Sequence, residues 1–78
     1  MGKVLSRIMY NYVVEIFWSN EDAGYIAVVP DLPGCSAYGE TMEEAAREII
    51  DAQEAWLEAC LASGEAIPQP YAQARKAA

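Results

Sequence analysis

The stretch PDLPGCSAYGET, residues 30–41, decides how this chain of 78 residues is organised. Pro33-Gly34 suits the central pair of a type II turn, because proline fixes φ at the first position and glycine supplies a positive φ at the second. Pro30 stiffens the corner further, and CSAY after it is short enough to be a strand. The stretch therefore predicts a stiff corner between two strands, followed by a helix that begins after Thr41.

Two strands are predicted before this corner. YNYVVEIFW, residues 10–18, is rich in β-branched and aromatic residues, which suit a pleated, half-buried surface. SNEDAG, residues 19–24, is a polar turn, and YIAVV, residues 25–29, is a second candidate strand, so the two should form an antiparallel hairpin. With a period of two, the better core face of the first strand carries Tyr10, Tyr12, Val14, Ile16 and Trp18.

A long helix is predicted directly after the corner. Thr41 and Glu44 form a capping box, in which the Thr41 hydroxyl accepts from the Glu44 N–H and the Glu44 carboxylate reaches back to the Thr41 N–H. Gly64 stands where a helix commonly ends. At 100° per residue one stripe is apolar and should pack on the sheet, namely Met42, Ala46, Ile49, Trp56, Leu57 and Cys60, with Ala45 and Ile50 on its flanks. The opposite side is acidic and carries Glu44, Arg47, Glu48, Asp51, Glu54 and Glu58.

These elements predict an α+β fold: a three-stranded antiparallel sheet with one long helix on one face, in the order β-β-β-α, with the tail able to add a short fourth strand. Residues 1–9 are expected to be a lead-in, 10–70 the domain, and 71–78 a C-terminal tail. A domain of this size buries only about 60–65% of the surface of its unfolded chain. Its core is marginal, so support from a second copy is a reasonable expectation.

The candidate oligomer interface lies on the second half of the helix. A flank of small residues there would let another helix approach closely, although alanine's helix propensity explains it equally well. Gln53 falls near the middle of the apolar stripe, where its amide needs a backbone carbonyl, a water or another chain as partner. The interface residues are Ala52, Gln53, Trp56, Ala59 and Cys60.

The charge balance bears on the class of partner. Five Lys and Arg stand against twelve Asp and Glu, giving a net charge of −7, and there is no histidine. Affinity for nucleic acid comes largely from basic groups that neutralise phosphates, so direct nucleic-acid binding is not expected. The balance favours a basic protein partner, and the alternative is that acidity merely keeps a small protein soluble.

No catalytic, cofactor or metal site is predicted. Cys35 has no histidine to deprotonate it, so nucleophilic catalysis is improbable. Glu15, Asp31 and Glu40 have no spacing that indicates a shared metal site. The two cysteines lack CxxC spacing, and there is neither a secretory signal nor an apolar run long enough to cross a membrane, which is typical of a cytoplasmic protein.

Residues 12–70 are similar to the HicB-like antitoxin domain family. The most specific parts are GYIAVVPDLPGC, GET followed by EEA at the start of the helix, and GEAIPQP at its exit. The resemblance implies a β-β-β-α(-β) fold, described as a partial ribonuclease H-like fold without a working nuclease centre. Many members carry a C-terminal DNA-binding module, for which we expect no room here, so the chain resembles a small single-domain member.

The resemblance also implies a function and a partner. It implies an antitoxin-type protein-binding module that neutralises a small basic ribonuclease, HicA-like, by masking its active site, and that forms a homo-dimer or tetramer. The candidate partner-binding residues are then Trp18, Leu32 and Pro33 as apolar contacts and Asp31, Glu40, Glu44, Glu48, Asp51 and Glu54 as acidic ones. Two alternatives are an orphan oligomeric domain with another protein partner and a residual nuclease that uses Glu15 and Asp31 with a divalent metal.

Overall fold

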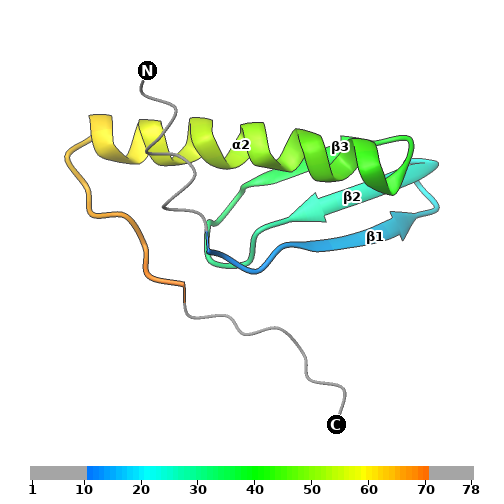
Figure 1. Cartoon of the computed structure of the whole chain (residues 1–78), viewed down its shortest axis with the longest axis horizontal. Coiled ribbons are helices and arrows are strands. Elements are labelled where there is room, and N and C mark those ends of the chain that lie inside the picture. Colours follow the sequence, from blue (N-terminus) through cyan, green and yellow to red (C-terminus); the bar gives the residue numbers. More distant parts are fainter. Residues whose placement is uncertain (1–10, 71–78) are drawn as a thin grey trace, which may run out of the picture.

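Three strands and one helix make up the part of the chain that the computed structural model describes, residues 11–70. They are β1 (Glu15–Ser19), β2 (Gly24–Val28), β3 (Ser36–Gly39) and α2 (Met42–Ala62). The sheet has the order β1-β2-β3 with antiparallel neighbours, and α2 crosses one of its faces (Figure 1). The predicted α+β fold is confirmed. Residues 63–70 add no fourth strand, and the lead-in, Tyr10 and the tail from Tyr71 onwards lie outside the described residues.

The hairpin pairs Glu15 with Val28 at one end and Ser19 with Gly24 at the other. β1 therefore begins later than the predicted residue 10. The ladder stops here because the next residue of the partner strand whose N–H would face β1 is Pro30, which has no N–H to donate. The prediction of a hairpin is confirmed, and that of a nine-residue first strand is wrong.

The corner after β2 forms the predicted type II turn. The Cys35 N–H donates to the Leu32 carbonyl at 2.9 Å, and Gly34 has φ +82°. A preceding turn closes with a bond of 3.0 Å from the Leu32 N–H to the Val29 carbonyl. The indole N–H of Trp56 donates to the Pro33 carbonyl at 2.9 Å, which fastens the corner to α2.

Both ends of α2 are fixed by local hydrogen bonds. The Thr41 hydroxyl accepts from the Glu44 N–H at 3.0 Å, as predicted. The Glu44 carboxylate accepts instead from the Glu40 N–H at 2.9 Å, one residue before the predicted partner. Gly39 approaches the Ala45 backbone so closely that a Cβ would collide with it, and this holds the chain before Thr41 against the first helical turn.

The C-terminus of α2 is a Schellman motif. Gly64 has φ +82° and donates its N–H to the Leu61 carbonyl at 2.9 Å, while the Glu65 N–H donates to the Cys60 carbonyl at 3.1 Å. These bonds satisfy carbonyls that a helix end leaves unpaired. The predicted helix end at Gly64 is therefore confirmed.

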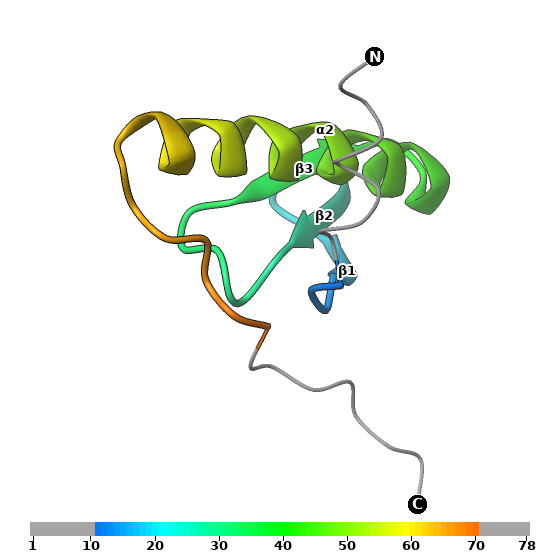
Figure 2. The ribbon, with the colours of Figure 1, turned by 60° about the vertical axis from the view of Figure 1, so that its left-hand side comes forward.

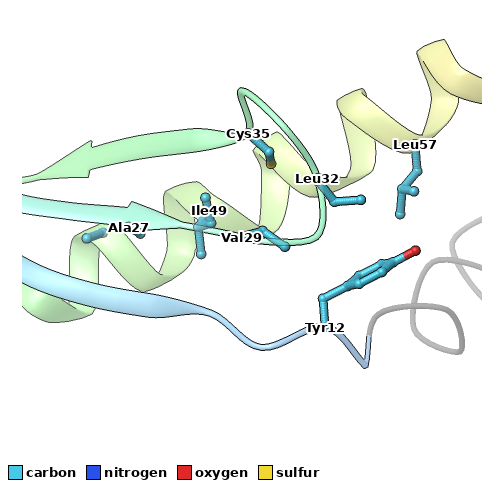
Figure 3. Close-up of a cluster of buried hydrophobic side chains, with 8 residues drawn as sticks. Tyr12, Ala27, Val29, Leu32, Cys35, Ile49 and Leu57 are labelled. Carbon is cyan, nitrogen blue, oxygen red and sulfur yellow. The ribbon is translucent and has the colours of Figure 1, made fainter. Parts of the chain in front are cut away.

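The core lies between α2 and one face of the sheet (Figure 3). Its buried members are Tyr12, Ala27, Val29, Leu32, Cys35, Ala45, Ile49 and Leu57. The buried line of the helix starts at Ala45 and runs through Ile49, Gln53 and Leu57 to Cys60. Met42 and Ile50, which were expected to pack on the sheet, are 53% and 51% exposed. Met42 lies in line with the buried residues but at the very start of the helix, whereas Ile50 lies beside that line.

The segments before β1 and after α2 meet at the corner end of the sheet. The Tyr12 hydroxyl donates to the Pro68 carbonyl, 56 residues further along the chain. Ile67 packs against the core beside this bond. A hydrogen bond thus joins the two ends of the described domain.

Candidate protein-binding surface

The strand register divides the sheet into two faces, because paired residues of neighbouring strands point to the same side. The face under α2 carries the rows Ile16, Ala27, Ala37 and Trp18, Tyr25, Gly39. The other face carries the rows Glu15, Val28, Ser36 and Phe17, Ile26, Tyr38, and we call these six residues the open sheet face. Figure 2 shows α2 on one side of the sheet, and no other described helix or strand covers the open sheet face.

The outer side of α2 is the acidic face, consisting of Glu43, Glu44, Glu48, Asp51, Glu54 and Glu58. One base, Arg47, lies among these six acids, so α2 has a net charge of −5 (6 − 1). Arg47 reaches Glu43 at 4.0 Å, but both side chains are largely exposed, and such pairs hardly offset the surrounding charge. The acidic face therefore produces a negative potential that attracts cationic surfaces.

Trp18 is the exposed aromatic residue at the hairpin end of the sheet. It is 51% exposed, although the alternation predicted it on the core face, because α2 covers β1 least. Its indole N–H donates to Asn20 Oδ1 at 2.7 Å, and its ring meets Tyr25 edge to face at 5.2 Å. These contacts hold the side chain in one orientation while leaving half of it accessible, as an apolar anchor for a partner requires.

The corner residues behave differently from one another. Leu32 is 0% exposed, so its prediction as a partner contact is wrong. The two consecutive turns of the corner direct its side chain into the core, where it packs with Val29 and Leu57. Pro33 is exposed, and Asp31 is half-buried and already engaged within the fold.

Among the acidic candidates, Glu40, Glu48 and Asp51 are exposed. Glu54 is half-buried, and Glu44 is half-buried with its carboxylate bonded at the helix cap. Glu40 lies just before α2, and the other four residues lie along the helix.

The partner-binding candidates do not form one patch. Trp18 pairs with Tyr25, which pairs with Gly39, so Trp18 and Glu40 share the hairpin end of the sheet. Asp31 and Pro33 belong to the opposite end, about 17 Å away along the five residues of β2. The C-terminal part of α2 continues past the corner end of the sheet (Figure 1).

The candidate oligomer interface is partly closed within the monomer. Gln53 is 4% exposed and Cys60 is buried, so neither side chain is available to a second chain. Ala52 and Trp56 are half-buried, and Ala59 is exposed. A shallow depression of about 230 Å³ is lined by Trp56, Ala59, Cys60, Ser63 and Glu65.

Two polar groups in this region differ in their pairing. Gln53 Oε1 has no hydrogen-bond partner among the described residues. The Cys60 thiol, in contrast, donates to the carbonyls of Glu65 and Ala66, at 3.7 and 3.3 Å. Gln53 thus carries an unpaired amide oxygen inside the domain, where such a group is costly.

Other exposed apolar residues are Phe17 and Tyr38 on the open sheet face, which sequence reasoning missed, and Met42, Ile50 and Leu61 on the helix. The signal for the first two was present, since YIAVV is apolar at every position and so requires cover on both faces of β2. Among residues 11–70 there is one helix for the two faces.

Cys35 is buried, and this burial raises the pKa of its thiol. The thiol therefore stays protonated at neutral pH, in agreement with a packing role.

Among residues 11–70 there is no group of three histidine, cysteine, aspartate or glutamate side chains placed to hold a metal ion. Nor does that part of the chain contain a helix with the length and apolarity needed to cross a membrane.

The chain was compared with known proteins. Residues 10–77 match the family model described as HicB-like antitoxin of bacterial toxin–antitoxin systems. Two UPF0150 proteins of Synechocystis sp., ssr1765 and ssl0259, are 36% and 35% identical to it. Both matches span 85% of this chain, and they cover 82% and 89% of the relatives. The UPF0150 protein Ta0767 of Thermoplasma acidophilum is 38% identical over 74% of this chain and 84% of its own length.

No solved structure matches the chain significantly, so the likeness to ribonuclease H stays a prediction. The family match, in contrast, includes every strand and the helix of the described domain. The conclusion from sequence and fold together is that the chain belongs to the family of HicB-like antitoxins of bacterial toxin–antitoxin systems.

Proposed function

We propose that the chain is a protein-binding module that neutralises a small, basic, HicA-type ribonuclease toxin by masking its active site. The acidic face is the observation that supports this most directly, because it gives α2 a net charge of −5 in a member of an antitoxin family. A ribonuclease must itself be basic where it holds RNA phosphates. Opposite charges would steer the two proteins together and align the toxin's RNA-binding surface with α2.

The hairpin end of the domain is the proposed contact point. Trp18 supplies an orientated, half-exposed ring, and tryptophan is among the residues that most often dominate binding energy. Glu40 and Glu44 lie at the same end, while Glu48, Asp51 and Glu54 continue the charge along α2. Asp31 and Pro33 lie at the other end, where Asp31 would add to the field without touching the toxin.

Masking requires no chemistry from the antitoxin, so the module is proposed to be non-enzymatic. We propose that it acts in the cytoplasm, because free cysteines such as Cys35 and Cys60 are the norm in that reducing compartment.

The test is coexpression with the toxin encoded by the adjacent gene, followed by co-purification and measurement of the association rate. The double variant Glu48→Lys/Asp51→Lys should slow association at least ~10-fold at low salt, and high salt should shrink this difference. Glu15→Lys/Glu65→Lys is the matched control, because both residues are exposed, lie outside α2 and away from the hairpin end, and bring the net charge to the same −3 (−7 + 4). That control should slow association far less.

Three results would contradict the proposal. Absence of both binding and growth rescue would favour an orphan domain with another protein partner. Equal effects of the two double variants would show that overall charge matters and the acidic face does not. Cleavage of RNA by a clean preparation with Mg²⁺ or Mn²⁺ would contradict the non-enzymatic role and point to Glu15 and Asp31.

A further inference from the structure

The depression of about 230 Å³ lies beside the last two turns of α2 and has no part in the proposed function. Trp56, Ala59, Cys60 and Ser63 line it from the helix and its cap, and Glu65 lines it from the segment that follows. Pockets that hold whole small-molecule ligands measure ~300–1,000 Å³. This depression is smaller, so its size suits a single long side chain.

Hydrogen bonds fix the walls of the depression. The indole N–H of Trp56 donates to the Pro33 carbonyl at 2.9 Å, which restrains the ring. The Glu65 N–H donates to the Cys60 carbonyl at 3.1 Å, and the Cys60 thiol donates back to the Glu65 carbonyl at 3.7 Å. The ring and the backbone that carries the Glu65 carboxylate are thus held before anything binds, which lowers the entropic cost of binding.

The electrostatic potential in the depression is negative. Glu65 contributes a carboxylate, and α2 contributes the negative end of its dipole, with no basic residue in its last turn. The one base among residues 11–70 is Arg47, which lies more than four helical turns before Ser63, about 24 Å away along the helix. The Glu65 carboxylate therefore has no basic partner within the described domain, and the depression favours a cation.

The side chains of the lining indicate which cation fits. Among aromatic rings, indole attracts a cation at its face most strongly. A guanidinium group is planar, so it stacks on such a ring while its N–H groups donate to a carboxylate, whereas an ammonium is more strongly hydrated. Trp56 and Glu65 together therefore favour arginine over lysine. An apolar side chain would leave the carboxylate unpaired, and an anion would be repelled by it.

We propose that this depression is a second interaction site, which receives an arginine side chain of a protein partner other than the toxin. Ala59 lies about 27 Å along α2 from Thr41, at the opposite end of the helix from the hairpin end (Figure 1). An interface of ~800 Å² per partner is about 30 Å across, so a toxin centred on Trp18 extends about 15 Å and does not reach the depression. The two partners are thus able to bind at the same time.

NMR of the full chain tests this inference, because the indole N–H groups of its two tryptophans, Trp18 and Trp56, give separate resonances. The probe is N-acetyl-arginine amide, which reproduces an arginine residue within a protein. It should shift the Trp56 resonance and saturate in roughly the millimolar range, since a single side chain makes few contacts. N-acetyl-citrulline amide, which is uncharged and of nearly the same shape, should bind at least ~10-fold more weakly at equal ionic strength.

Two variants with the same change of charge separate the depression from the general attraction of an acidic chain. Glu65→Gln removes the carboxylate and keeps the backbone bonds of the helix end, so the affinity reported by Trp56 should fall at least ~3-fold. Glu58→Gln removes an exposed carboxylate of the acidic face and should leave that affinity within about 1.5-fold. An unchanged Trp18 resonance shows that both variants are folded.

Several results would overturn the inference. Equal binding of the two probes, or equal losses in the two variants, would show that the depression does not recognise the charge. Tighter binding of free arginine, whose own carboxylate Glu65 repels, would point to a free amino acid as the ligand. Without any probe, a Trp56 resonance that moves with protein concentration would point to a second copy, and one that moves in Arg75→Gln/Lys76→Gln would point to the chain's own tail.

The inference does not depend on the proposed function. No toxin is present in these measurements, so a failure of arginine binding leaves toxin neutralisation untouched. Conversely, an absence of toxin binding leaves the response of the Trp56 resonance to the arginine probe unchanged.

Discussion

Both faces of the sheet carry apolar side chains, and α2 covers one of these faces. Under α2, Ala27 is 0% exposed and Ile49 of the helix packs against the same cluster. On the open sheet face, Phe17 and Tyr38 keep close to half of their surface accessible. Burial in the described domain is therefore limited by the number of covering elements and not by the supply of apolar side chains.

Truncating one residue on each face should show the largest contrast. Ile49→Ala leaves a cavity under α2 and should lower the free energy of unfolding by about 2–5 kcal/mol. Phe17→Ala removes a larger side chain from the open sheet face and should cost about 1 kcal/mol or less, since half of that ring is already in water. Urea unfolding at micromolar concentration measures both, and equal costs would mean that the two faces are equally buried in solution.

Replacing a glycine by alanine at two different sites should give the second largest contrast in stability. At Gly39 a Cβ would collide with the backbone of Ala45, which cannot move without shifting α2. At Gly24 it would collide with the ring of Tyr38, which can swing into solvent. Gly39→Ala should therefore cost about 2–3 kcal/mol and Gly24→Ala about 1 kcal/mol, by thermal or urea unfolding.

Which of the two variants loses more stability tests whether the Tyr38 ring is free to move. If Gly24→Ala is the more harmful variant, Tyr38 is held in place by something on the open sheet face. A second copy would do this at high concentration, so the measurement should be repeated there.

The smallest expected effect is a gain in stability on the helix side. Gln53 is buried and its Oε1 is unpaired, so Gln53→Met should raise the free energy of unfolding by about 1 kcal/mol. Gln69→Met, at an exposed position, is the control and should be neutral. A loss of stability in Gln53→Met would show that the amide has a partner in solution, such as a buried water.

The features that could be predicted from the sequence are those fixed by neighbours along the chain. The cap at Thr41, the helix end at Gly64 and the turn at Pro33-Gly34 each depend on residues within a few positions. The helix stripe was less well predicted, because helical periodicity does not tell which strand a helix will lie over. Met42 and Ile50 were assigned to that stripe or its flank and are exposed, and Trp18 is exposed because α2 lies least over β1.

The sequence predicted the kinds of residue that form the candidate surface, but it did not predict how the fold arranges them. The acidic face follows from helical periodicity: five of its residues were predicted for the outer side of the helix, and Glu43 was not. Leu32 was misassigned because two consecutive turns direct its side chain inward, and the register that isolates Phe17 and Tyr38 is visible only once the strands are paired.

The bond between the Tyr12 hydroxyl and the Pro68 carbonyl has a consequence for how the domain is joined to other proteins. The chain enters and leaves the described domain at one place, the corner end (Figure 1). A tether, tag or fused module joined directly to residue 11 or to residue 70 would start from that place, at the far end of the sheet from Trp18. Affinity tags joined at these two positions should therefore be equally compatible with partner capture at the hairpin end.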